Sequence, residues 1–195
     1  LIKSAQGWPL SIIEKTMEIN GTKITEDELG LLKRIAQDGA IKPPSINTPH
    51  SGTNFFLFTP SPGASILNPT KKEIYERALA LVSSVRQGQF LADRYRIKMP
   101  VALLRSLKNK GYINANTEAL DQYKMLTVNR VGFLENVGNG WHRFRLHDIE
   151  ENIEALDTAI HLLSSGIISG LEVNQDARFA LQKDQSYIES IISSH

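Results

Sequence analysis

Residues 133–147 read FLENVGNGWHRFRLH, two short aromatic and apolar runs that meet at Asn139–Gly140. Asparagine followed by glycine is the strongest short-range signal for a two-residue hairpin turn, because both residues tolerate a positive φ. A turn at this position pairs Val137 with His142, Glu135 with Phe144, and Phe133 with Leu146. The stretch therefore predicts a β-hairpin.

The returning strand of this hairpin has two faces of different chemistry, because side chains alternate along a strand. One face carries His142, Phe144 and Leu146. The other carries Trp141, Arg143, Arg145 and His147. This second face has the residues of a stacking and phosphate-binding surface. It has an equally good interpretation as a half-buried tryptophan covered by arginine stems.

Two helix patterns precede the hairpin. The run PVALLRSLKNKGYI begins at Pro100, which suits the first position of a helix, and Gly111 suits its end. The run NTEALDQYKMLTVNR predicts a second helix at about 117–129, although 124–134 fits the first strand of a longer hairpin as well. Residues 90–97 fit either a short helix or a strand.

Two helices followed by a hairpin resemble a winged helix-turn-helix, over roughly residues 70–147. The resemblance implies that the second helix enters the major groove of DNA and that the wing rests on the backbone or the minor groove. Groove-facing candidates on that helix include Lys124 and Asn129. Glu118 and Asp121 in the same helix count against this placement, because carboxylates repel phosphates.

The N-terminal part has weaker signals. A short helix is expected from Leu10 to Ile19, and a second helix begins at the capping-box pair Thr25 and Glu28. Residues 40–53 have the composition of a loop, and 54–59 that of a buried strand. The stretch 59–69, TPSPGASILNP, has the composition of a linker.

These signals predict an α+β protein, mainly α with small β-hairpins. Three units are expected: a helical, winged-helix-like unit at 1–60, a basic winged-helix-like unit at 70–147, and acidic helices at 148–195. The first unit has the elements of a degenerate second winged helix, so the chain reads as one or two such units. A helix at 70–88 is expected to start at a Thr70–Glu73 capping box, and the last helix to span about 175–193.

Charge is distributed unevenly, although the formal net charge is +1. Residues 71–147 carry fourteen basic and six acidic residues, whereas residues 148–195 carry two basic and nine acidic ones. A basic segment predicts a polyanionic partner. The alternative is that the acidic tail packs against the basic middle and neutralises it.

Several classes of protein are disfavoured by composition. The chain has no cysteine, which excludes disulfides, cysteine-ligated zinc and cysteine nucleophiles and fits a reducing cytosol. The sequence predicts no membrane span and no enzyme: His142, His147, Asp148 and Glu151 lack a clear further metal ligand, and no cofactor motif is present. A first residue other than methionine suggests a fragment or a processed chain.

The sequence thus predicts a non-enzymatic protein that binds double-stranded DNA through phosphates, cytoplasmic or nucleoid-associated. The acidic helices would serve a homodimer, a protein partner or regulation. The alternative is an adaptor subunit without direct DNA contact. The expected nucleic-acid contacts are Arg105, Lys108, Lys110, Lys124, Asn129, Arg130, Trp141, Arg143 and Arg145, with Lys71, Lys72, Arg94, Arg96 and Lys98 as extensions. For the cations of the helix at 100–110, a simple solvated face explains the pattern about as well.

Overall fold

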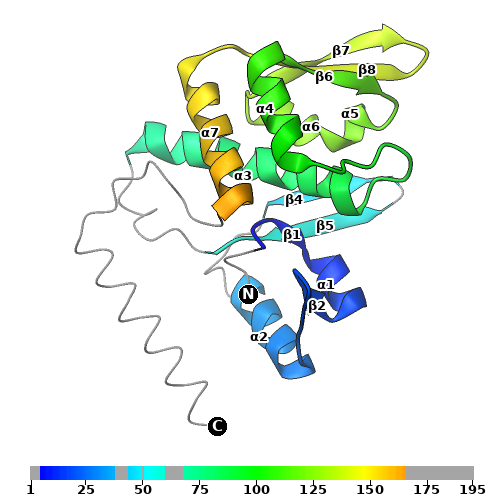
Figure 1. Ribbon diagram of the computed structural model, residues 1–195, viewed down its shortest axis with the longest axis vertical. Coiled ribbons are helices and arrows are strands. Elements are labelled where there is room, and N and C mark those ends of the chain that lie inside the picture. Colours follow the sequence, from blue (N-terminus) through cyan, green and yellow to red (C-terminus); the bar gives the residue numbers. More distant parts are fainter. Residues whose placement is uncertain (1–4, 38–43, 50, 60–67, 166–195) are drawn as a thin grey trace.

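The computed structural model describes residues 5–37, 44–49, 51–59 and 68–165, and the helix expected at 175–193 lies outside this range. The described part is an α+β fold with three small antiparallel sheets, ordered β1-β5-β4, β2-β3 and β6-β8-β7. Figure 1 shows the third sheet at one end of the molecule and the N-terminal helices at the other, with α3 between them.

The N-terminal part alternates short helices and strands. Its elements are β1 (Trp8–Pro9), α1 (Leu10–Thr16), β2 (Glu18–Ile19), β3 (Thr22–Lys23), α2 (Glu26–Gln37), β4 (Ser45–Thr48) and β5 (Gly52–Leu57). The Thr25–Glu28 capping box is confirmed: the Thr25 backbone N–H donates to the Glu28 carboxylate at 2.8 Å, and the Glu28 N–H donates to the Thr25 hydroxyl at 3.2 Å. The expected loop at 40–53 was wrong for residues 45–48, which form β4, and for residues 52–53, which begin β5 and pair with β4.

Helix α3 (Pro69–Phe90) is the long central helix. The expected Thr70–Glu73 capping box was wrong, because Asn68 is the N-cap and its side chain accepts from the Lys71 N–H at 2.9 Å. Glu73 instead pairs with Arg77 one turn along. Gly88 does not end this helix. It lies where α3 meets Ile97 and Gln122 so closely that a β-carbon would overlap both side chains.

The next six elements are α4 (Pro100–Lys110), β6 (Tyr112–Asn116), α5 (Ala119–Gln122), α6 (Lys124–Val128), β7 (Gly132–Gly138) and β8 (Trp141–Leu146). Pro100 and Gly111 bound α4 as predicted, with Gly111 at φ 76°. Residues 90–97 form neither the separate helix nor the strand expected of them: Phe90 ends α3 and residues 91–97 are loop. The Ile97 N–H donates to the Gly88 carbonyl at 2.9 Å and holds this loop against α3.

The single helix predicted at 117–129 was wrong. The chain forms α5 and α6, which meet at Tyr123, and a strand, β6, precedes them. Tyr123 is buried with its ring 5.7 Å from that of Phe144, and its backbone departs from helical geometry. Packing of one large ring against β8 thus competes with continuation of a helix whose own propensity is modest.

The β7–β8 hairpin has the predicted turn but not the predicted register. Asn139 and Gly140 both have positive φ, and Gly138 pairs with Trp141 across them. The register then shifts by one residue between Asn136 and Gly138, so the strands continue with Glu135 opposite Arg143 and Phe133 opposite Arg145. A bulge of this kind moves side chains to the other face of the sheet. Glu135 therefore lies on the face of the arginines.

The hydrophobic core is continuous from the first sheet to the last helix. One cluster contains Ile46 and Phe56 of the first sheet, Leu81 of α3, Leu104 of α4 and Leu156 of α7 (Glu150–Ser165). This cluster contains residues from both sides of the linker expected at 59–69, of which residues 60–67 lie outside the described ranges. The division of the chain at that point stays a prediction. A smaller cluster lies under α1 and β2.

The side chain of Asn152 joins four parts of this fold. It is fully buried at 0% exposure, and its carbonyl oxygen accepts from Arg77 of α3 at 2.8 Å. Its amide nitrogen lies within 3.2 Å of the backbone carbonyls of Arg130, Val131 and His147. These contacts fix α7 to α3 and to the outer ends of β7 and β8.

We expect Asn152→Ala to lower the free energy of unfolding by about 2–4 kcal/mol, because it leaves Nη1 of the buried Arg77 without its acceptor and removes the amide hydrogen bonds to the carbonyls at the ends of the hairpin. Urea denaturation of the variant and of Asn109→Ala, which alters an exposed asparagine of α4, provides the comparison. An equal effect of the two substitutions would contradict the assignment of Asn152.

Alanine substitutions at two helical glycines, Gly88 and Gly30, should change the stability of the protein in opposite directions. Gly88→Ala should destabilise the protein by about 1–3 kcal/mol, since the new methyl group overlaps Ile97. Gly30→Ala in α2 meets no atom within 4 Å and should stabilise it by about 0.5–1 kcal/mol through helix propensity. Thermal unfolding followed by circular dichroism measures both changes; a stabilising Gly88→Ala would show that α3 and the loop do not approach closely.

Candidate nucleic-acid interface

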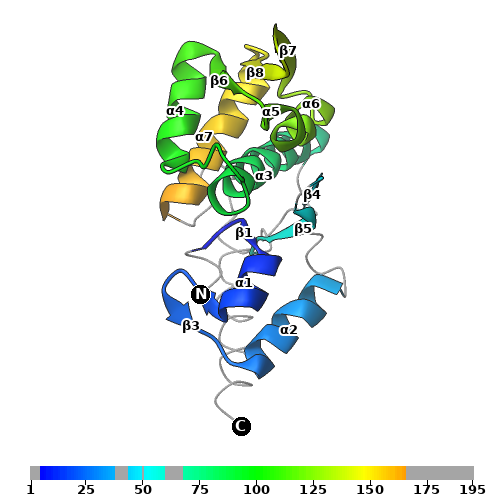
Figure 2. The same ribbon diagram turned by 90° about the vertical axis from the view of Figure 1, so that its right-hand side faces the viewer.

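The nine residues predicted to contact nucleic acid do not form one surface. They fall into three groups, on α4, at α6 and on β8. Figure 2 shows α4 and α6 on opposite sides of this part of the molecule. A single nucleic-acid strand lying on one group would therefore not reach all of the others.

The α4 group is partly neutralised by α7. The Lys108 ammonium lies 2.6 and 2.9 Å from the two carboxylate oxygens of Asp157, and Lys71 of α3 contacts Glu154 at 3.5 Å. For these two lysines the acidic segment does pack against the basic one. Arg105 and Lys110 are exposed, but five residues of an α-helix separate their directions by about 140°.

The α6 group has two exposed cations, Lys124 and Arg130. The side-chain amide of Asn129 donates to the Met125 carbonyl at 2.8 Å, so it is committed to its own backbone. Arg130 follows the end of α6 and adopts a left-handed conformation with φ 58°. The backbone carbonyl of Arg130 accepts a hydrogen bond from the Asn152 side-chain amide. Helix α6 has five residues, which is short for a groove-reading helix.

On β8, Arg143 and Arg145 share one carboxylate. Arg145 Nε donates to Glu135 Oε2 at 2.8 Å, and Arg143 Nη1 lies 3.7 Å from the same oxygen. The hydrogen bond from Arg145 and the two positive charges hold the pKa of Glu135 below its ordinary value, and the carboxylate raises the pKa of Arg145. The shifted register creates this pairing, which the predicted register excluded.

Trp141 lies at the start of β8. The structure places it beside the loop that carries Arg94, Arg96 and Lys98, which the sequence predicted only as extensions of the nucleic-acid contacts. The Trp141 ring packs edge-to-face against Tyr95 at 5.7 Å, which brings the loop before α4 to the hairpin. The Arg94 backbone N–H anchors the same loop to the Glu118 carboxylate at 2.7 Å. We call Arg94, Tyr95, Arg96, Lys98 and Trp141 the basic corner.

The basic corner holds three exposed cations within five residues. Asp93 contacts Arg94 only weakly, at 3.9 Å, and both side chains are largely exposed. The alternation Arg94–Tyr95–Arg96 was the available sequence signal. What the sequence did not contain was the contact with Trp141, some 46 residues later in the chain.

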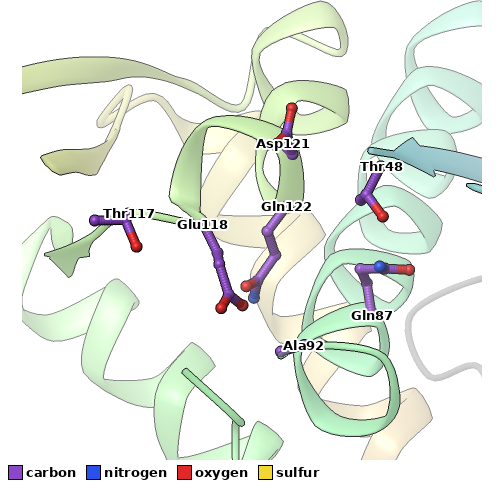
Figure 3. Close-up of a pocket in the computed structure, with 7 residues that line it drawn as sticks. All are labelled: Thr48, Gln87, Ala92, Thr117, Glu118, Asp121 and Gln122. Atoms are coloured by element: carbon purple, nitrogen blue, oxygen red, sulfur yellow. The ribbon is translucent and has the colours of Figure 1, made fainter. Parts of the chain in front are cut away.

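A small polar recess lies beside the basic corner, lined by Thr48, Gln87, Ala92, Thr117, Glu118, Asp121 and Gln122. Its volume is about 60 Å³, which suits a few water molecules and is far below the size of most cofactor sites. Figure 3 shows the Glu118 carboxylate beside the Gln122 amide, with Asp121 directed elsewhere. Among the described residues, Gln87 Oε1 is buried without a hydrogen-bond partner, as a group facing such water would be.

Within the described ranges, no group of three His, Asp or Glu side chains is placed to hold a metal ion. None of the helices there is long and apolar enough to span a bilayer. Comparison of the chain with protein-family models, curated proteins and solved structures gives no match.

We expect Arg145→Ala to raise the pKa of Glu135 toward that of a free glutamate, because the short hydrogen bond is the largest cause of its depression. Arg143→Ala, which removes only the longer contact, should raise it less. NMR titration of the side-chain carboxyl of Glu135 measures the shift in each variant. The reverse order would contradict the observed geometry.

Proposed function

We propose that this protein binds double-stranded DNA through a winged-helix-like unit formed by α4–β8, with the basic corner on the phosphate backbone. The observation that carries the proposal is the Tyr95–Trp141 contact. It concentrates Arg94, Arg96 and Lys98 beside the hairpin that would serve as the wing. Arginine and lysine at such a site neutralise phosphates and set position rather than read sequence.

The order of elements supports this proposal. Helix α4 is followed by strand β6, the close pair α5 and α6, and the hairpin, and β6 pairs with β8 to give the order β6-β8-β7. This helix–strand–helix–helix–hairpin order is similar to that of a winged helix. A winged helix puts the second helix of its pair in the major groove. Here that helix is α6 with Lys124, which takes the role first expected of a single helix at 117–129.

The charges near this face also bear on the proposal. Glu118 accepts a hydrogen bond from the Arg94 backbone, so part of its charge is compensated locally. Asp157 and Glu154 hold Lys108 and Lys71 on the far side, at α7. Among the described residues, Arg96, Lys98 and Lys124 have no ion pair, and neither do Arg105, Lys110 and Arg130. The first three lie in the loop before α4 and on α6, the elements that the proposal uses.

A second candidate function is a protein-interaction adaptor, and one observation favours it. Leu120 of α5 and Val128 of α6 are 47% and 74% exposed, and they flank Lys124 in the sequence. Exposed apolar side chains of this size suit a protein partner better than a phosphate backbone. Salt separates the candidates, since phosphate binding weakens steeply with ionic strength. Dimerisation or regulation through the acidic helices stays a prediction.

Replacing Arg94, Arg96 and Lys98 together by alanine should weaken binding to a random 20-base-pair duplex at every sequence tested. The slope of log affinity against log salt should fall by about one unit for each phosphate that the protein no longer neutralises. Fluorescence polarisation at several salt concentrations measures both quantities.

Arg105→Ala is the control, because it removes an exposed cation of α4 that lies outside the basic corner. It should leave the affinity and the salt slope nearly unchanged. Duplex binding that is insensitive to the triple substitution would refute the basic corner as the interface. Absence of duplex binding by the unmodified protein even at low salt would favour the adaptor.

A further inference from the structure

The sheet β6-β8-β7 has one buried face and one open face. Ile113 and Phe144 point into the core, where Tyr123 packs against Phe144. Figures 1 and 2 show α5 and α6 on this side of the sheet, and no described helix covers the opposite side. The open face is made by Tyr112, Phe133, Glu135, Arg143 and Arg145, and we call it the outer sheet face.

Aromatic rings and guanidinium groups alternate across the outer sheet face. Arg145 of β8 is paired with Tyr112 of β6 on one side and with Phe133 of β7 on the other. The guanidinium carbons of Arg143 and Arg145 lie 5.1 and 6.0 Å from the centre of the Tyr112 ring. Phe133 is 44% exposed, and its ring lies 5.4 Å from that of His147.

The charge of this face is positive and incompletely paired. Glu135 is the carboxylate that both arginines contact, so one negative charge compensates two positive ones. Arg143 Nε is buried and has no hydrogen-bond partner among the described residues, so a ligand would meet the Nη groups of this side chain rather than Nε. Glu135 also fixes the guanidinium planes, which reduces the side-chain entropy that a ligand would otherwise have to remove.

We propose that the outer sheet face binds single-stranded nucleic acid. Unpaired bases would stack on Phe133 and on the guanidinium planes above Tyr112, and the free donors of Arg143 and Arg145 would contact phosphates. An antiparallel sheet that displays aromatic and arginine side chains on an open face presents surfaces for the faces of bases. Bases in a duplex are stacked on one another and offer only their edges.

This inference goes beyond the proposed duplex function, although both sites include residues of β8. The outer sheet face uses Arg143 and Arg145 of β8 with residues of β6 and β7, whereas the basic corner uses Trp141 of β8 with the loop before α4. Each set of residues can be altered without touching the other. A protein partner is the competing occupant of this face, because arginine and aromatic residues are also enriched at protein interfaces.

The test uses the full chain and fluorescence polarisation with four labelled 15-mers: oligo(dT), an abasic oligodeoxynucleotide, oligo(U) and a mixed-sequence duplex. The abasic strand keeps the phosphates and removes the bases. We expect oligo(dT) or oligo(U) to bind at least fivefold more tightly than the abasic strand, and their comparison shows whether DNA or RNA is preferred. Equal binding of the abasic strand, or no single-strand binding at low salt, would overturn the proposal.

Phe133→Ala should weaken single-strand binding by about 5- to 100-fold, as expected for the removal of one base–aromatic stack. Phe133→Leu keeps an apolar side chain but no ring and should weaken binding almost as much. Phe55→Ala is the matched control, since Phe55 is also 44% exposed but belongs to β5 of another sheet. It should leave the affinity unchanged.

Arg145→Ala should also reduce single-strand affinity, while the triple alanine variant of the basic corner should affect the duplex more than the single strand. Circular dichroism of each variant serves as the control for folding. Single-strand affinity that is unaffected by both Phe133→Ala and Arg145→Ala would refute the site, even if duplex binding at the basic corner holds.

Discussion

The buried amide of Asn152 is the contact on which the arrangement of the C-terminal half depends. It accepts a hydrogen bond from Arg77, a cation that is itself only 6% exposed, and donates to backbone carbonyls at both outer ends of the β7–β8 hairpin. Losing such buried hydrogen bonds is costly, so they favour one position of α7 against α3 and the sheet. Apolar burial alone, through residues such as Leu156 and Leu162, would tolerate small shifts of α7 along α3.

The position of α7 in turn decides which cations remain free. Because α7 lies against α3 and α4, Asp157 and Glu154 reach Lys108 and Lys71. The uneven charge of the chain is thereby reduced on one side of the molecule and left in place near the hairpin. The position at which the acidic segment packs, rather than its total negative charge, thus determines which lysines are neutralised.

One bulge in the hairpin has a comparable effect on the outer sheet face. In the register expected from the turn alone, Glu135 would lie with Phe144 toward the core. The shift between Asn136 and Gly138 places it beside Arg143 and Arg145. A sheet face that would have held the arginines without a carboxylate thus becomes an ordered set of rings and guanidinium groups with one shared carboxylate. Such order favours stacking over simple attraction of phosphates.

The amino-acid sequence by itself determined the local features: the Asn139–Gly140 turn, the ends of α4 at Pro100 and Gly111, and the capping box at Thr25. Each depends on conformational preferences or hydrogen bonds within a few residues. Tertiary structure decided the break of the helix at Tyr123, the strand β6, the bulge and the pairing of Glu135. These depend on packing and charge contacts between segments distant in the chain, such as Tyr123 with Phe144 and Tyr95 with Trp141. Local patterns therefore specified most of the elements, and the contacts between elements decided which charged and aromatic side chains meet.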